Sequence, residues 1–289
     1  MKLQSMLISL ALILTIIPLA ACTELDDSDG PPERIISLAP SNTEILFALG
    51  LGDSVVGVTE YCSYPPEARQ KTTIGGFSTI DIERVIELDP DLVLATGMHE
   101  ETVVPHLRDK GIKVLVINPQ TLDEVCLDIA LVGVETERFE ESNMLVTDIE
   151  NRIKTVISKV SSASEKPSVF YVTWHDPIWT LGKDTITHEL IEIAGGSNIF
   201  SDSEGHMETN LETAIARNPE IILASAGHGA AEDSPVTWAQ TDDRLRGIDA
   251  RNNGRIYQVN ADLVTRAGPR AIEGLELIAE LIHPEIFGE

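Results

Sequence analysis

Basic residues are scarce in this sequence. The 289 residues include 47 Asp and Glu against 21 Lys and Arg, which gives a formal net charge of -26 at pH 7. A body with this charge repels phosphate backbones, so the composition argues against nucleic acid as a partner. The acidic excess fits a saline habitat and equally fits a simple requirement for solubility.

Cysteine is also rare, with three residues in the whole chain. Cys22 belongs to the N-terminal segment discussed below, which leaves Cys62 and Cys126. These two could pair in an oxidising exterior or remain free thiols. Sequence spacing does not decide between the two states, because a disulfide depends on how close the Cα atoms lie in space.

The short motifs of common catalytic and nucleotide sites are missing. The sequence has no G-x-G-x-x-G, no G-x-x-x-x-G-K-[ST] and no G-x-S-x-G, and Gly75-Gly76 is too short to cradle a phosphate. No H-E-x-x-H spacing marks a zinc or manganese site. We therefore expect no enzyme, no ATP site, no prosthetic group and no resident metal.

Residues 1–21 have the pattern of a secretory signal peptide. Lys2 supplies a positive start, and an almost unbroken apolar run extends from Met6 to Ala21. A permanent bilayer span needs roughly 20 apolar residues, so this run is short for one. No other segment of the sequence is suited to span a membrane.

The signal segment ends in Leu-Ala-Ala-Cys, which resembles a lipobox. In that motif the peptide is cut before the cysteine, here Cys22, and the thiol receives a lipid. Residues 22–33 are polar, acidic and rich in turn formers, as expected of a flexible tether. The protein is then exported, to the outer face of the cytoplasmic membrane or to a periplasm. An ordinary signal peptide with a chance cysteine and an uncleaved anchor are the alternatives.

Short apolar runs alternate with amphipathic stretches along the rest of the chain. This alternation predicts an α/β fold with mostly parallel sheets flanked by helices. The expected strands are Arg34–Leu38, Ser54–Val58, Asp91–Ala95, Lys113–Ile117, Ser168–Val172, Glu220–Ala224 and Arg255–Val259.

An internal repeat indicates two similar lobes. Residues 83–95 (ERVIELDPDLVLA) recur as residues 212–224 (ETAIARNPEIILA), with the glutamate, isoleucine, proline, acid and apolar strand at the same offsets. We expect an N-terminal lobe over residues 34–136 and a C-terminal lobe over 163–289. Two such lobes in tandem form a cleft, which is a favoured place for a ligand.

The segment between the lobes, residues 137–162, has mainly helical apolar spacing. Neither glycine nor proline occurs from Glu135 to Glu165. One long helix of about 35 Å at 1.5 Å per residue is expected to join the lobes. A single rigid connector permits only a modest hinge.

Several motifs, in order along the chain, resemble the helical-backbone solute-binding proteins of ABC importers. They include RIISLAPSNTEIL from Arg34, Tyr64-Pro-Pro, Pro90-Asp-Leu-Val and GGSNIF from Gly195. That family carries vitamin B12, ferric siderophores and haem. The resemblance implies a monomer that delivers its ligand to a permease dimer, with ATPase subunits on the far side of the membrane.

Within that family the sequence is most similar to the cobalamin-binding branch. By this resemblance Tyr61 would face the corrin, and Phe77 falls where the branch has a stacking tryptophan. Asp262 and Arg266 fall on another cleft loop, and Met207, beside His206, stands near the second-lobe tryptophan position. The resemblance implies a bound corrinoid, with ferric siderophore or haem as the alternative ligand.

Other candidates follow from position and chemistry. Trp174 and Trp179 lie near strand ends, where open α/β sheets bind ligands, and flat aromatic walls suit a macrocycle. His175 could approach a ligand metal as a neutral imidazole, or serve only as a hydrogen-bonding loop residue. Arg266 and Arg270 could bind a ligand anion or pair with nearby acids.

The repeat glutamates, Glu83 and Glu212, carry a further expectation. The resemblance places them opposite arginines on the two transporter subunits, and such charge pairs orient a docking partner. They also suit the helix N-termini at which they stand. A Rossmann-like enzyme and a surface sensor or adhesion module without transport are the rival interpretations of the whole chain.

Overall fold

The computed structural model describes residues 30–226 and 234–288. Residues 31–289 form one compact unit. The expected signal peptide, Cys22 and most of the tether lie outside the described residues. Within the described ranges, no helix combines the length and apolar character needed to cross a membrane.

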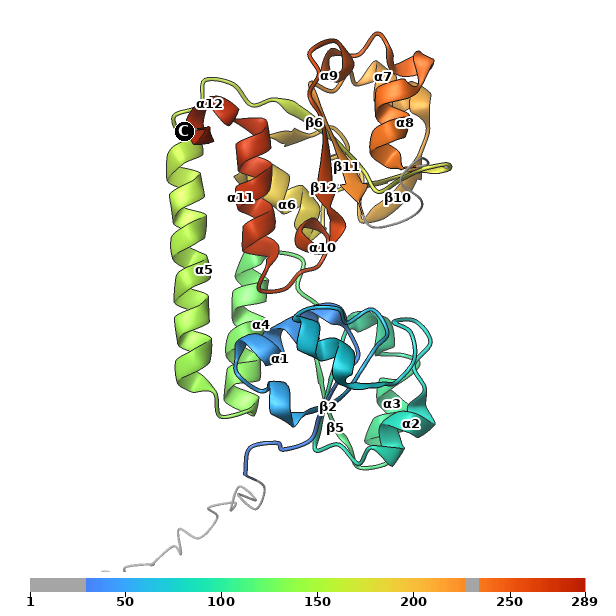
Figure 1. The fold of residues 1–289 in the computed structure, drawn as a ribbon, viewed down its shortest axis with the longest axis vertical. Coiled ribbons are helices and arrows are strands. Elements are labelled where there is room, and N and C mark those ends of the chain that lie inside the picture. Colours follow the sequence, from blue (N-terminus) through green and yellow to red (C-terminus); the bar gives the residue numbers. More distant parts are fainter. Residues whose placement is uncertain (1–29, 227–233, 289) are drawn as a thin grey trace, which may run out of the picture. The chain divides into compact units, whose positions relative to one another are not determined.

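The N-terminal lobe is built on a five-stranded parallel sheet, shown in Figure 1. Its order is β3 (Thr72–Thr73), β2 (Val55–Val58), β1 (Ile35–Ser37), β4 (Leu92–Ala95) and β5 (Lys113–Val116). Strands β1 and β4 are buried along their whole length, which explains their unbroken apolar sequence. The helices are α1 (Pro40–Ala48), α2 (Ile82–Glu87), α3 (Val104–Arg108) and α4 (Leu122–Glu135), with 3-10 turns at Gly52–Ser54, Pro66–Gln70 and Gly97–His99.

The C-terminal lobe contains a four-stranded parallel sheet and a small antiparallel one. The parallel order is β12 (Ile256–Asn260), β11 (Ile221–Ala226), β6 (Ser168–Val172) and β9 (Ser197–Asn198); the antiparallel order is β10 (His206–Thr209), β8 (Ile178–Leu181) and β7 (Trp174–His175). Its helices are α6 (Ile186–Ile193), α7 (Leu211–Ala216), α8 (Pro235–Thr241), α9 (Asp249–Asn252), α10 (Ala261–Val264), α11 (Ala271–Ile282) and α12 (Pro284–Phe287), with a 3-10 turn at Asp243–Leu245. A strand occupies each of the seven ranges expected from the sequence, and the two-lobed α/β fold is confirmed.

The sequence repeat is a repeat of structure. Asp81 and Asn210 cap α2 and α7 by accepting the backbone N–H three residues on. Asp89 and Asn218, each before a proline, share a left-handed backbone with φ of 46° and 41°. The acid after each proline then accepts a backbone N–H at the start of the neighbouring strand, Asp91 from Arg34 and Glu220 from Ser168. The helix, turn and strand of the two lobes are therefore held in the same way.

The expected connecting helix is α5 (Phe139–Val160), whose 22 residues span about 33 Å. It follows α4 after a tight turn and runs beside it, as Figure 1 shows. Gly133 allows this close approach, because a Cβ there would lie 2.2 Å from Ser142 Oγ.

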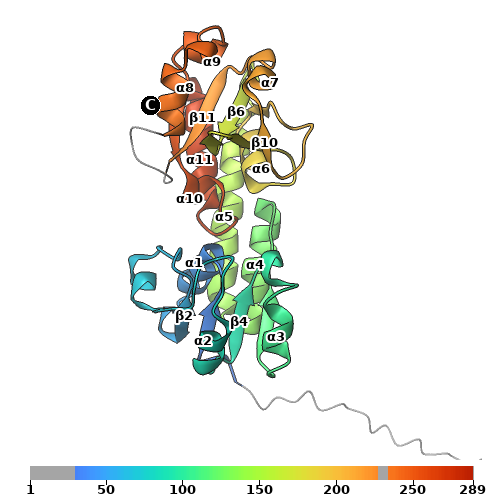
Figure 2. The same cartoon turned by 90° about the vertical axis from the view of Figure 1, so that its right-hand side faces the viewer.

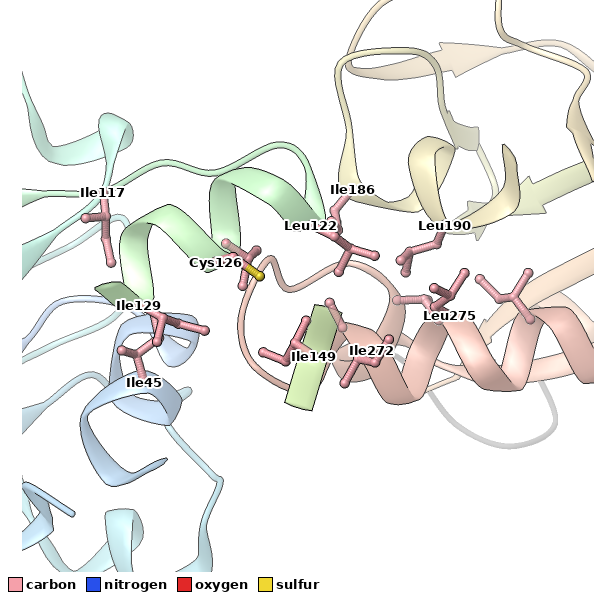
Figure 3. Close-up of a cluster of buried hydrophobic side chains, with 14 of the residues drawn as sticks. Ile45, Ile117, Leu122, Cys126, Ile129, Ile149, Ile186, Leu190, Ile272 and Leu275 are labelled. Carbon is pink, nitrogen blue, oxygen red and sulfur yellow. The ribbon is translucent and has the colours of Figure 1, made fainter. Parts of the chain in front are cut away.

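One hydrophobic cluster extends through both lobes, as Figure 3 shows. Leu122 and Cys126 of α4 lie between the N-terminal residues and those of α6 and α11. A polar contact joins the same elements, because the Leu122 N–H donates to Glu189 Oε2 of α6 at 2.6 Å. A large movement of one lobe against the other would expose this shared core at roughly 25 cal/mol per Å². The labelled members are Ile45, Ile117, Leu122, Cys126, Ile129, Ile149, Ile186, Leu190, Ile272 and Leu275.

Candidate functional site

A cavity of about 700 Å³ is lined by residues of both lobes. Most lining segments follow strands β1 to β5 in one lobe and β6, β8 and β12 in the other, whereas Leu181 and His206 lie within β8 and β10 of the antiparallel sheet. Figure 2 shows α10, which comes directly after β12, on the side of its lobe nearest α1. The cavity therefore lies mainly at the carboxyl ends of the parallel strands, where open α/β sheets bind their ligands.

Four of the seven ligand-contact candidates line this cavity. They are Tyr61 and Phe77 from the N-terminal lobe and Asp262 and Arg266 from the C-terminal lobe. Trp174, Trp179 and Met207 are not part of the lining.

The antiparallel sheet explains where these three residues lie. Trp174 stands opposite Trp179 in the β7–β8 pair. The Trp179 ring packs at 4.9 Å, centroid to centroid, on His206, which does line the cavity. Met207 packs against the separate core of the C-terminal lobe. The two tryptophans therefore lie outside the lining, and Trp179 contacts it through His206.

His175 also lies away from the cavity lining. Its ring contacts Trp174 at 5.0 Å and stacks on Trp238 of α8 at 5.8 Å between centroids. His206 is the histidine of this sheet that lines the cavity, and although its side chain is exposed, partial desolvation lowers the pKa of its imidazole. A neutral imidazole thus stands at the cavity, one position from the expected Met207.

Tyr61 is 55% exposed, yet its loop is held firmly. The Thr43 hydroxyl donates to the buried Cys62 Sγ at 3.1 Å, and Thr59 Oγ1 lies 3.2 Å from the same sulfur. The thiols of Cys62 and Cys126 are both free. An exposed phenol ring on an anchored loop is a ready surface for an apolar ligand.

Phe77 lies on a loop that packs closely against the Tyr61 loop. A Cβ at Gly76 would lie 2.9 Å from Glu60 Oε1, and Gly75 has a left-handed φ of 100° that glycine adopts without strain. The Glu60 N–H donates to the Gly75 carbonyl at 3.0 Å. The pair Gly75-Gly76 therefore brings two aromatic side chains to one wall of the cavity.

Arg266 carries the positive charge of the opposite wall. Its Nη2 lies 2.7 Å from Asp262 Oδ1, and its Nη1 lies 3.6 Å from Glu44 Oε1 without a hydrogen-bond partner. The Nη1 atom itself is buried, so a ligand oxygen in the cavity would meet the 20% of the Arg266 side chain that is exposed.

Arg270 behaves differently from Arg266. Its guanidinium holds Glu44 in a two-pronged pair and lies over the Tyr64 ring at 3.9 Å. Burial raises the pKa of Glu44, although its bonds to Arg270 oppose that rise. Arg270 therefore pairs with Glu44 and does not line the cavity.

Sequence reasoning missed several lining residues. Met98 and Asn118 follow β4 and β5, where the strand-end rule would have found them, and Thr173 follows β6. Thr187 comes from the start of α6, which no local pattern marks. Within the described ranges, no group of three or more His, Cys, Asp and Glu side chains could hold a metal ion.

Two relatives match most of this chain. An uncharacterised ABC transporter substrate-binding lipoprotein of Bacillus subtilis is 38% identical over 269 residues, covering 89% of this chain and 82% of that protein. A vitamin B12-binding protein of Vibrio cholerae is 31% identical over 272 residues, covering 91% and 96%.

Several solved structures share the fold, including three from Vibrio cholerae, Staphylococcus epidermidis and Roseiflexus. The periplasmic vitamin B12-binding protein of Vibrio cholerae has a TM-score of 0.77 and 30% identity, covering 89% of this chain and 98% of its own. A possible iron-binding periplasmic protein of Staphylococcus epidermidis has a TM-score of 0.76 and 32% identity, covering 88% and 99%. A haem-binding protein of Roseiflexus reaches 0.78 at 24% identity, covering 87% and 98%, which is a likeness of fold alone.

The family described as periplasmic binding protein matches residues 35–263. Members of this family are carriers rather than enzymes, and the resemblance read from the sequence motifs is confirmed. The chain belongs to the periplasmic binding protein family, as a substrate-binding protein of an ABC transporter.

Proposed function

We propose that this protein captures a corrinoid, such as cobalamin, outside the cell and delivers it to an ABC importer. The observation that carries this proposal is the cavity of about 700 Å³ shared by the two lobes. Tyr61 and Phe77 supply flat apolar surface, whereas Asp262 and Arg266 supply hydrogen-bonding groups. A corrinoid, a large ring with amide arms, needs both kinds of surface. The vitamin B12-binding relative supports the same ligand class.

Capture requires little movement of the lobes. The shared core and α5 keep them together, so a ligand enters a site that is already largely formed. A preformed site loses less conformational entropy on binding. In this proposal the importer then spreads the lobes and hydrolyses ATP on its own subunits.

Docking to the permease dimer is assigned to Glu83 and Glu212. Both are exposed, and both occupy the second position of equivalent helices, α2 and α7. Two like acids, one on each lobe, suit a partner made of two subunits, because charge complementarity fixes orientation. We further propose that a lipid on Cys22 holds the monomer at the outer face of the membrane.

A second candidate ligand is haem or a ferric siderophore. Tyr61 and His206 bring a phenol and a neutral imidazole to the cavity, and both groups serve as ligands of haem iron. Arg266 would then pair with a propionate or a siderophore oxygen.

A visible absorption titration, with calorimetry beside it, tests the ligand. The chain from Thr23 onward retains the whole compact unit and is titrated with cyanocobalamin, cobinamide, haemin and ferric siderophores. One-to-one binding of the corrinoids is expected. Binding of haemin or a siderophore alone would contradict the corrinoid assignment and leave the carrier role intact.

Reconstituted uptake tests docking. The double variant Glu83→Ala/Glu212→Ala should lose uptake while its ligand affinity stays unchanged. Glu87→Ala is the matched control, because Glu87 is an exposed acid on the same helix and pairs with Arg84. Normal uptake by the double variant would refute the docking assignment and favour a sensor without transport.

A further inference from the structure

His99 lies at the junction of two loops that line the cavity. It ends the 3-10 turn after β4 and is only 2% exposed. Its Nδ1 lies 3.1 Å from the Thr96 backbone nitrogen and 3.2 Å from Thr96 Oγ1. Its Nε2 lies 2.8 Å from the carbonyl oxygen of Phe77, 22 residues away. One buried ring therefore ties the β4 loop to the Phe77 loop.

The hydrogen bonds define the protonation state of this ring. A backbone N–H always carries its proton, so Thr96 N–H donates and Nδ1 accepts. A carbonyl oxygen only accepts, so the His99 proton resides on Nε2 and is donated to Phe77. The neutral imidazole with its proton on Nε2 therefore has a hydrogen-bond partner for each of its ring nitrogens.

The contacts of His99 reach the cavity through two lining residues. The Phe77 ring meets the His99 ring edge-on, with centroids 5.4 Å apart and planes at 83°. Met98, the preceding residue, lines the cavity and is 56% exposed. The Phe77 loop contains Gly75 and Gly76, and glycine restricts the backbone less than other residues do. The hydrogen bond from His99 to the Phe77 carbonyl therefore helps to fix where Phe77 lies.

We propose that neutral His99 is a positioning residue for ligand binding, which holds Phe77 and Met98 in the cavity wall and loosens that wall when it is protonated. This inference rests on the proposed function, because it concerns the same cavity. Phe77 would touch the ligand, whereas His99 acts through Phe77.

Protonation disrupts the arrangement for a simple reason. A second proton on Nδ1 would point at the Thr96 N–H, and two donors would face each other in a buried space. Burial lowers the pKa of His99 below its usual 6.5, while the bond to the Phe77 carbonyl opposes that fall. The neutral state therefore persists at neutral pH, and binding weakens as the pH falls through this lowered pKa.

Other titratable groups near His99 could also make ligand affinity depend on pH. The adjoining segments carry the carboxylates Glu60, Asp81 and Glu100, and Asp81 is engaged in capping α2. Across the cavity stand Asp262 and His206, and partial desolvation lowers the pKa of His206 as well. His206 is thus the chief competing source of any loss of affinity on the acid side of neutral pH.

Cyanocobalamin affinity between pH 5 and pH 8 tests the proposal. The wild type should lose affinity on the acid side, by up to about tenfold per pH unit below the pKa of His99. His99→Gln keeps a donor and an acceptor but loses the ring that packs on Phe77, so its affinity should be lower at pH 7.5. Because glutamine does not titrate, that affinity should be nearly flat with pH. His206→Gln should keep the acid loss. His106→Gln, which changes an exposed histidine of α3, should match the wild type throughout.

Two results would overturn the proposal: an acid loss retained in His99→Gln, or one abolished in His206→Gln. If no compound binds the wild type, the proposed function fails, and nitrogen NMR of the ligand-free protein then tests His99. An Nε2–H tautomer, a pKa below 6.5, and a shift of the Met98 methyl signal at that same pH are expected. An Nδ1–H tautomer or an unmoved Met98 signal would refute the positioning role.

Discussion

Glu44 and Arg270 form a two-pronged ion pair between the lobes. Arg270 Nε donates to Glu44 Oε2 at 3.0 Å and Nη2 donates to Oε1 at 2.6 Å, across 226 residues of sequence. Glu44 lies in α1 of the first lobe, and Arg270 is the N-cap residue of α11 in the second. With side chains only 2% and 13% exposed, the pair is shielded from solvent screening.

Removing one partner of this pair should be costly. Glu44→Ala leaves the Arg270 charge buried without its partner, so we expect a loss of about 3–5 kcal/mol in the free energy of unfolding. Glu87→Ala breaks an exposed pair with Arg84 and should cost less than about 1 kcal/mol. Urea denaturation of both variants at pH 7 measures the difference. Similar small losses would show that the pair contributes little to joining the lobes.

Much of the fold follows from the sequence because its signals are local. The seven main strands are apolar runs, and the repeat preserves the proline and acid that shape each turn. The small antiparallel sheet was not predicted. Its strand β7 has only two residues, Trp174 and His175, and so short a strand has no measurable alternation.

The candidate site was harder to predict, because it depends on contacts between distant residues. A strand end indicates the right edge of the sheet but not which side chain enters the cavity. Trp174 and Trp179 follow β6 closely, yet their pairing in the β7–β8 hairpin places them outside the lining. The contact of His99 with Phe77 spans 22 residues and leaves no pattern in the sequence.

Asp128 of α4 should make stability depend on pH. Burial, and secondarily the charge of Glu124, raise the pKa of Asp128 from 3.8 to about 6. Its ionised form is therefore disfavoured in the folded state. The penalty is absent below pH 3.8, grows between there and pH 6, and is complete above it.

The variant Asp128→Asn isolates this penalty. It should raise the free energy of unfolding by about 1 kcal/mol at pH 8, a value reduced for partial solvent screening, and should give no gain near pH 3.5. Asp123→Asn, an exposed acid in the first turn of the same helix, should give no gain at either pH. A gain for Asp128→Asn that did not change with pH would contradict the assignment.

Cys126 should react slowly as a thiol, even in the oxidising exterior in which the protein is expected. Burial, aided by the charges of Glu150 and Asp123, raises the pKa of Cys126 to about 11. At pH 8 its thiolate fraction is about a hundredfold below that of an ordinary cysteine. In a Cys62→Ser variant of the chain from Thr23 onward, labelling of Cys126 with a disulfide reagent should be slower than in the urea-unfolded chain by at least that factor. Equal rates would show that Cys126 is accessible and ionised.

The aromatic residues can be ranked by their effect on ligand affinity. Phe77 lines the cavity, whereas Trp174 lies outside the lining, with its Nε1 donating to the Asp176 carbonyl at 2.9 Å. Phe77→Ala should therefore weaken cyanocobalamin binding by about 1–3 kcal/mol, the cost of losing a buried aromatic contact. Trp174→Ala should cost less than half of that, although Trp174 is the larger ring. Calorimetric titration at pH 7.5 gives both values. A larger loss for Trp174→Ala would mean that the ligand extends from the cavity onto the β7–β8 hairpin. Trp174 and Trp179 would then be ligand-binding residues, as the sequence predicted.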